Sequence, residues 1–154
     1  MSDQKPIEGM SLIVKTACGW LKGFILLYGI HIVLYGHLTP GGGFAGGVIA
    51  AAAFLLILLA EGEREGLKAF SKRTALTWRS LGALVFLAVA GLGLVVTGIF
   101  FKSFWTGGHA AGSFTHFGSS IQISETGIGL LVCSSLYLVV LVLSDGASGY
   151  ESER

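Results

Sequence analysis

Residues 35–60 read YGHLTPGGGFAGGVIAAAAFLLILLA, and this stretch places Pro40 and three consecutive glycines directly before a long apolar run. Proline lacks a backbone N–H, and glycine adopts dihedral angles that other residues avoid, so the combination interrupts a helix. We therefore expect one helix to end near Gly36 and a second to begin near Gly43 or Phe44, joined by a tight turn.

The composition of the whole chain indicates a membrane protein. Hydrophobic residues make up 53% of the sequence and charged residues only 12%, and the mean hydropathy is +0.76. A chain of this kind is expected to fold with the lipid bilayer as its solvent. The formal net charge of +1 gives no basis for a nucleic-acid partner. Cys18 and Cys133 both lie in apolar runs, which favours packing residues over a disulfide or a metal pair.

Four segments are long and apolar enough to cross a bilayer, which takes about twenty residues in a helix. We therefore predict an all-α membrane protein in which residues 1–154 form a single domain of four transmembrane helices. The expected spans are residues 10–36, 43–60, 80–101 and 123–143.

The distribution of lysine and arginine predicts the orientation of the chain. With four spans, both termini and the connection between the second and third helices share one side. That side carries Lys5, Arg64, Lys68, Lys72, Arg73, Arg79 and Arg154, whereas the opposite side has only Lys102. Because positively charged loops stay in the cytoplasm, we expect both termini to be cytoplasmic.

The second helix carries a stripe of small residues that repeats every four positions. Gly43, Gly47 and Ala51 form one such row, and Gly42, Gly46 and Ala50 lie beside it. A stripe of this kind lets another helix approach closely. The partner is either the first or third helix of this chain or a helix of another subunit. In the second case a bulky residue at Gly43 or Gly47 would dissociate the subunit from its complex.

Ionisable residues inside the spans are the candidates for function, because a charge in hydrocarbon is costly unless it is paired or hydrated. If Lys15 lies at the membrane surface, Lys22 lies about 10 Å deeper on the same face of the first helix. Its side chain either reaches back to the surface or lines a hydrated ion path, where it would pair with a carboxylate of another subunit.

Glu125 and His31 are the other two candidates for an ion path. Glu125 follows Ser124, so it is either a first-turn carboxylate behind an N-cap serine or a ligand for a sodium ion or proton. His31 lies near the outer end of the first helix, on the face opposite Lys22. It either bonds a carbonyl or headgroup at the interface or relays protons.

The sequence contains no arrangement that supports catalysis. It has no Ser-His-Asp set, no CxxC motif and no dinucleotide fingerprint. His109 and His116 lack a carboxylate or cysteine that would complete a metal site. A haem would need histidines on two facing helices, and only His31 lies within a span. We therefore expect a non-catalytic protein without a cofactor or a bound metal.

The segment GHLTPGGGFAGGVIAAAAFLL closely resembles the signature of the B-type component of Mrp-type (Mnh-type) multisubunit cation/proton antiporters. The residues that match the motif position by position are Pro40, Gly41, Gly42, Gly43, Phe44, Gly46 and Gly47. The four-helix layout and the sequence Glu125-Thr126-Gly127 at the start of the last helix are also similar, although the family often has aspartate in place of Glu125.

This resemblance implies an accessory subunit of a prokaryotic cell membrane, packed among other hydrophobic subunits and helping to form the path for sodium ions and protons. The same subunit type occurs in Mrp-related respiratory complexes that couple electron transfer to ion pumping, with a hydrogenase, formate-oxidising or sulfur-reducing arm. Two further hypotheses are an assembly subunit without contact to the ion and a stand-alone homo-oligomeric transporter. Glu125 at a helix end, without an acidic residue deep inside a span, makes the stand-alone transporter poorly equipped.

Overall fold

The computed structural model describes residues 12–36, 41–62, 66–68, 70–99 and 120–152. Four long helices account for most of this part, and each is long and apolar enough to cross a membrane. They are α1 (Leu12–Tyr35), α2 (Gly42–Glu61), α4 (Lys72–Thr97) and α5 (Ser120–Ser152). The prediction of an all-α protein with four candidate membrane-spanning helices is therefore confirmed.

Two helix boundaries differ from the predicted spans. α4 begins at Lys72 instead of Ser80, because Ser71 caps it: its side-chain oxygen accepts a hydrogen bond from the Thr74 N–H at 3.2 Å. Lys72, Arg73 and Arg79 therefore belong to a helix and not to the connection where we expected them. The prediction was wrong because a hydropathy criterion stops at charged residues, whereas the backbone continues from a good cap.

The second difference is at α5, which begins at Ser120 and continues past Leu143 to Ser152. Ser124 therefore lies inside the helix, where its hydroxyl donates a hydrogen bond to the Ser120 carbonyl at 2.9 Å. It is not the N-cap that we expected.

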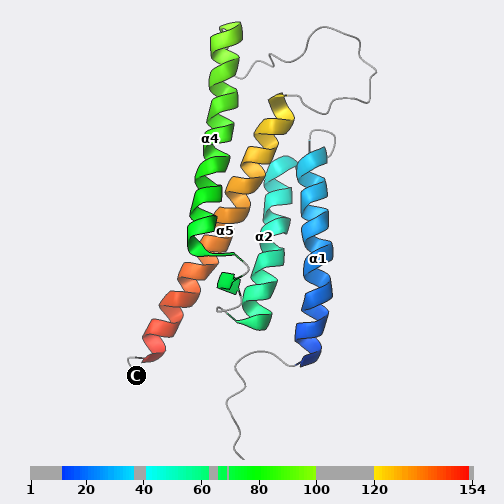
Figure 1. Ribbon diagram of the computed structural model, residues 1–154, viewed down its shortest axis with the longest axis vertical. Coiled ribbons are helices and arrows are strands. Elements are labelled where there is room, and N and C mark those ends of the chain that lie inside the picture. Colours follow the sequence, from blue (N-terminus) through cyan, green and yellow to red (C-terminus); the bar gives the residue numbers. More distant parts are fainter. Residues whose placement is uncertain (1–11, 37–40, 63–65, 69, 100–119, 153–154) are drawn as a thin grey trace, which may run out of the picture.

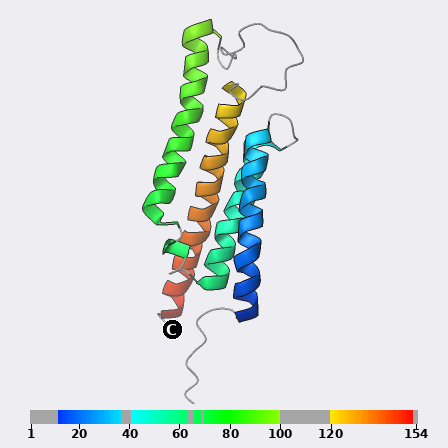
Figure 2. The same ribbon diagram turned by 45° about the vertical axis from the view of Figure 1, so that its right-hand side comes forward.

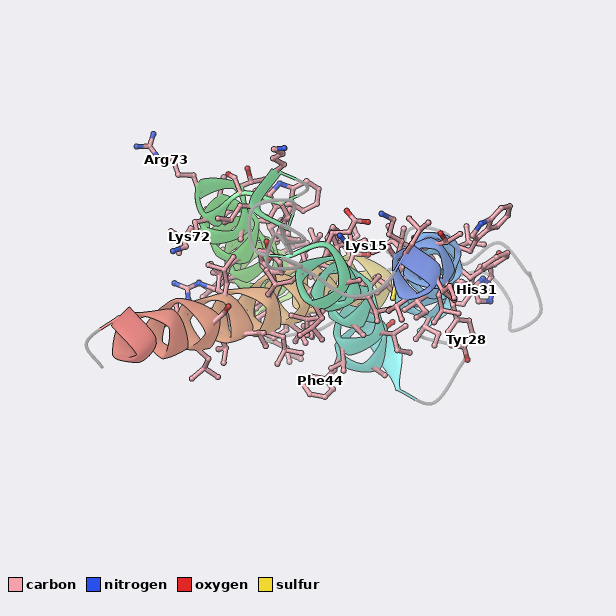
Figure 3. The ribbon with its side chains drawn as sticks, turned by 90° about the horizontal axis from the view of Figure 1, so that it is seen from below. Lys15, Tyr28, His31, Phe44, Lys72 and Arg73 are labelled. Atoms are coloured by element: carbon pink, nitrogen blue, oxygen red, sulfur yellow. The ribbon has the colours of Figure 1, made fainter. Side chains whose placement is uncertain are left out.

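The helices pack in the order α1, α2, α5, α4, and α5 also makes a smaller contact with α1. Figures 1 and 2 show α2 and α5 running side by side, with α4 packed along α5. Seen along the helices in Figure 3, α1 and α4 lie on opposite sides of the assembly. The turn after α1 thus brings the start of α2 close to the start of α5.

Glycines set the separation between these helices. A Cβ added to Gly46 would lie 2.8 Å from the carbonyl oxygen of Gly29 on α1, and one added to Gly47 would lie 2.7 Å from that of Gly129 on α5. The same close approach joins α4 to α5, where a Cβ on Gly82 would lie 2.6 Å from the Gly127 oxygen. The partners of the small-residue stripe on α2 are therefore α1 and α5 of the same chain, and not the third helix.

A buried aromatic cluster holds the connection between α2 and α4 against α5. Tyr137 is fully buried, and its hydroxyl lies 3.0 Å from the Gly66 carbonyl and 2.9 Å from the Phe70 carbonyl, so it can donate to either. The Phe70 ring stacks on Phe54 of α2 with centroids 5.0 Å apart. Ala75 at the start of α4 joins the same cluster. This contact fixes where α4 begins along the length of α5.

Candidate functional site

The start of α2 is built from glycine backbone without a capping side chain. Gly41 and Gly42 have φ angles of 121° and 54°, a region in which L side chains are strained. Gly41 occupies the N-cap position and makes no side-chain cap hydrogen bond. Its carbonyl accepts the Ala45 N–H at 3.1 Å, which closes the first turn. The N–H groups of this turn therefore form the positive end of the α2 dipole.

The carboxylate of Glu125 lies against this positive end. A Cβ added to Gly42 would lie 3.0 Å from Glu125 Oε1, and one added to Gly36, at the end of α1, would overlap Oε2. A Cβ on Gly43 would overlap the backbone carbonyl oxygen of Glu125. The Oε2 atom is shielded from solvent. Glycine at these three positions is therefore what lets the carboxylate enter the break between α1 and α2.

This geometry changes the electrostatic role that we expected for Glu125. We predicted a first-turn carboxylate stabilised by the dipole of its own helix, but α5 already begins at Ser120. The dipole that favours the charged form is that of α2, and such an arrangement contributes about 0.3–1 kcal/mol, or up to about 2 when partly buried.

Gln122 ties the same region together and was not among the sequence candidates. Its side chain is buried, and its amide nitrogen donates a hydrogen bond to the Leu34 carbonyl near the end of α1 at 3.0 Å. The bond satisfies one of the carbonyls that the end of a helix leaves open. Only a long-range contact reveals this role, because a glutamine at the start of a helix carries no signal by itself.

Lys22 has a partner within its own chain. Its ammonium lies 3.1 Å from Glu61 Oε1 at the end of α2, and the two side chains are about one-third exposed at 34% and 29%. One of our alternatives took the partner from another subunit. We missed Glu61 because the predicted span ended at Ala60, although a charge one residue beyond the span was a usable signal. The pair joins α1 to α2 at the end opposite to Glu125.

His31 does not join the Glu125 site. It is exposed, and its ring lies against Tyr35 with centroids 4.7 Å apart. Figure 3 shows His31 and Tyr28 on the side of α1 that faces away from the other helices. The structure thus separates Lys22, His31 and Glu125 into three places and brings only Glu125 to the motif.

The remaining motif residues have structural positions. Gly46 and Gly47 are buried between helices, whereas Phe44 is 62% exposed and points away from the bundle in Figure 3. Pro40 lies outside the described residues, as do His109 and His116. Within the described ranges, no group of three or more histidine, cysteine or acidic side chains is placed to hold a metal ion.

A separate apolar groove of about 540 Å³ lies between α1 and α4. Its walls include Ile30 and Trp78, and its floor includes Ala50 and Cys133. Cys18 and Cys133 are both free thiols, which confirms that they do not form a disulfide. None of Lys22, His31 and Glu125 lines the groove, so the ionisable candidates lie elsewhere.

Comparison with known proteins gives relatives in bacteria and archaea. The chain is 37% identical over 102 residues to a Bacillus subtilis protein named as the B-type component of a Na⁺/H⁺ antiporter, covering 64% of this chain and 61% of the relative. It is 32% identical over 140 residues to an uncharacterised protein of Methanocaldococcus jannaschii, covering 86% and 52%. The chain therefore spans between half and two thirds of these relatives.

A solved structure shares both sequence and fold. It is a chain of the membrane-bound sulfane sulfur reductase, an archaeal respiratory membrane complex, with 31% identity and a TM-score of 0.69. The match covers 88% of this chain and 59% of that one. The family model described as a domain related to the MnhB subunit of Na⁺/H⁺ antiporters matches residues 13–138, which include the motif, Lys22 and Glu125. The chain therefore belongs to the MnhB-related family.

Proposed function

We propose that this chain is an accessory, non-catalytic subunit of a multisubunit Na⁺/H⁺ antiporter in a prokaryotic cell membrane, with both termini in the cytoplasm. Membership of the MnhB-related family supports the proposal, as does similarity to a protein named as an antiporter subunit. Its partners are other hydrophobic subunits and the surrounding lipid, and the transported species are sodium ions and protons.

The position of Glu125 carries the proposed role in the ion path. A sodium ion prefers oxygen ligands, and the break between α1 and α2 collects them. The carboxylate enters the break beside Gly36 and Gly42, and the end of α1 leaves backbone carbonyls without helical partners. Irregular backbone of this kind at membrane depth is tolerated where protein or water replaces lipid. In this proposal Glu125 supplies the negative charge and the end of α1 supplies neutral oxygens.

The positive end of α2 makes the site suitable for release as well as for binding. An isolated carboxylate would hold a cation tightly, whereas the dipole already offsets part of the carboxylate charge. A path residue needs such moderate affinity, because an ion has to leave as well as enter. Lys22 is outside this path, since its charge is paired with Glu61.

A matched pair of substitutions tests the role of Glu125. In everted membrane vesicles containing the whole complex, we expect Glu125→Gln to abolish cation-dependent collapse of the pH gradient, because it removes the charge with little change in shape. Glu61→Gln is the control, since it makes the same change at the opposite end of α2. Normal transport by a fully assembled Glu125→Gln complex would leave this chain as a scaffold without contact to the ion.

A second candidate function places the same subunit in an ion-pumping respiratory complex. The observation that favours it is the similarity in sequence and fold to a chain of the membrane-bound sulfane sulfur reductase. The two functions differ in the energy source and use the same membrane part, so Glu125 keeps its role in both.

The subunits that copurify with a tagged chain decide between these functions. Extraction from the native membrane in mild detergent, followed by mass spectrometry, is expected to recover hydrophobic antiporter-type subunits. Additional iron-sulfur or hydrogenase-like subunits would establish the respiratory complex. Recovery of the chain alone would contradict both readings and favour a stand-alone transporter.

A further inference from the structure

α4 is displaced along the direction of the helices relative to its neighbours. In Figures 1 and 2 its lower end stands above the lower ends of α1, α2 and α5, and its upper end rises above theirs. Close contacts between glycines fix the offset. Gly82 of α4 lies at the level of Gly127 and Leu131 of α5, and between those two residues Gly129 faces Gly47 of α2. Gly82 and Gly47 therefore lie at the same depth.

This register places Arg79 in the middle of the layer that α2 spans. α4 runs antiparallel to α2, so Arg79 lies about 4.5 Å from Gly82 toward the α2 end at Glu61, level with Ala50. The twenty residues of α2, from Gly42 to Glu61, span about 30 Å, which matches the hydrocarbon core of a bilayer. Arg79 therefore lies about 16 Å inside the end of α2.

Arg79 is exposed on the surface of the bundle at this depth. An arginine side chain stays charged in proteins, so burial cannot neutralise it. Among the side chains that the structure describes, the acidic ones are Glu61, which is already in an ion pair, and Glu125, which lies at the start of α2. Asp145 and Glu151 belong to the far end of α5, about 20 Å or more along that helix from the level of Arg79. None of these four positions is level with Arg79.

Lipid does not satisfy a guanidinium at this position. Hydrocarbon offers no hydrogen-bond acceptor, and charged residues within spans face the interior of an assembly and pair there. Headgroup phosphates lie beyond the end of α2, about 16 Å away, which is farther than a side chain extends by snorkelling. Arg73 differs, because it lies about 9 Å closer to that end. A second copy of this chain in the same orientation would place Glu61 and Glu125 at their own depths, not opposite Arg79.

We propose that Arg79 forms an intramembrane ion pair with an aspartate or glutamate on a transmembrane helix of another subunit, which packs along α4. The guanidinium presents several donors in a planar fork that fits a carboxylate with two parallel hydrogen bonds. This inference rests on the proposed function only in requiring a multisubunit complex. It assigns α4 as the helix through which that complex contacts the chain at mid-membrane depth.

Photocrosslinking identifies what lies against this part of α4 while leaving Arg79 intact. A benzophenone amino acid replaces Leu76, which is 46% exposed and one turn from Arg79, in a tagged chain produced with its native complex. We expect a covalent adduct with one hydrophobic subunit that has an acidic residue inside a span. Adducts with lipid alone, or with a second copy of this chain, would overturn the proposal.

Substitutions then test the charge. We expect Arg79→Gln to reduce copurification of the crosslinked subunit about tenfold or more, because it leaves a buried carboxylate unpaired. Arg73→Gln should change nothing. Exchanging the charges, with Arg79→Glu here and arginine at the partner carboxylate, should restore copurification. Unchanged recovery with Arg79→Gln would refute the pair. If the unsubstituted chain brings no subunits, the proposed function fails together with it.

Discussion

Replacing Gly47 by alanine tests the contact on which the position of Glu125 depends. The added Cβ would lie 2.7 Å from the Gly129 carbonyl oxygen and 3.1 Å from Val132 Cβ. Both partners are fixed, one by the backbone of α5 and the other by branching. Gly91→Ala is the matched control, because a Cβ there has no neighbour within 4 Å. Both glycines lie in helices, so the gain in helix propensity is common to the two variants.

The size of the effect follows from how far α5 has to move. Ordinary contact begins near 3.4 Å, so α2 and α5 would separate by about 0.7 Å. A gap of about 0.5–1 Å removes a quarter to a half of each dispersion contact, and a buried side chain makes about 40–60 contacts of about 0.1–0.2 kcal/mol. Overpacking of this kind costs about 1–3 kcal/mol. Gly91→Ala should stabilise the fold by up to about 1 kcal/mol.

Thermal unfolding of the full chain in detergent, followed by intrinsic fluorescence, measures the difference. We expect the midpoint of Gly47→Ala to fall below that of Gly91→Ala, by about 2–4 °C for each kcal/mol in a chain of this size. In the assembled complex, Gly47→Ala should also weaken cation transport, because the shift moves Glu125 away from the start of α2. Equal midpoints for the two variants would show that α2 and α5 do not approach at these glycines.

Two further substitutions test contacts that hold the inner end of the bundle. Tyr137→Phe removes the hydroxyl shared by two carbonyls of residues 66–70, which should cost about 1–3 kcal/mol and speed tryptic cleavage in that connection, whereas the exposed Tyr28→Phe should not. Equal cleavage of both variants would contradict the role of the hydroxyl. Lys22→Gln and Glu61→Gln should each destabilise the chain, and the double variant should be more stable than their sum predicts, because the two charges pair at 3.1 Å. Additive effects in unfolding measurements would show that the pair is not formed.

The sequence was sufficient to predict the number of helices and the break between the first two. Apolar segments of about twenty residues have to satisfy their backbone internally in a membrane, which leaves helices as the solution. The motif around Gly43 interrupts the chain for a local reason, since proline and glycine act on their own backbone. These features depend on neighbours in sequence, so the sequence pattern was enough to predict them.

The tertiary structure decided which groups meet. Glu125 interacts with the start of α2 and not with its own first turn, Lys22 pairs with Glu61, and the small-residue stripe packs against α1 and α5. Each of these contacts depends on how far one helix slides along another, which is set by packing of glycine surfaces and by the Tyr137 cluster. Hydropathy along the sequence carries no information about that register. For the same reason it assigned Arg79 to a surface connection, whereas the packing of Gly82 on α5 places it level with the middle of α2.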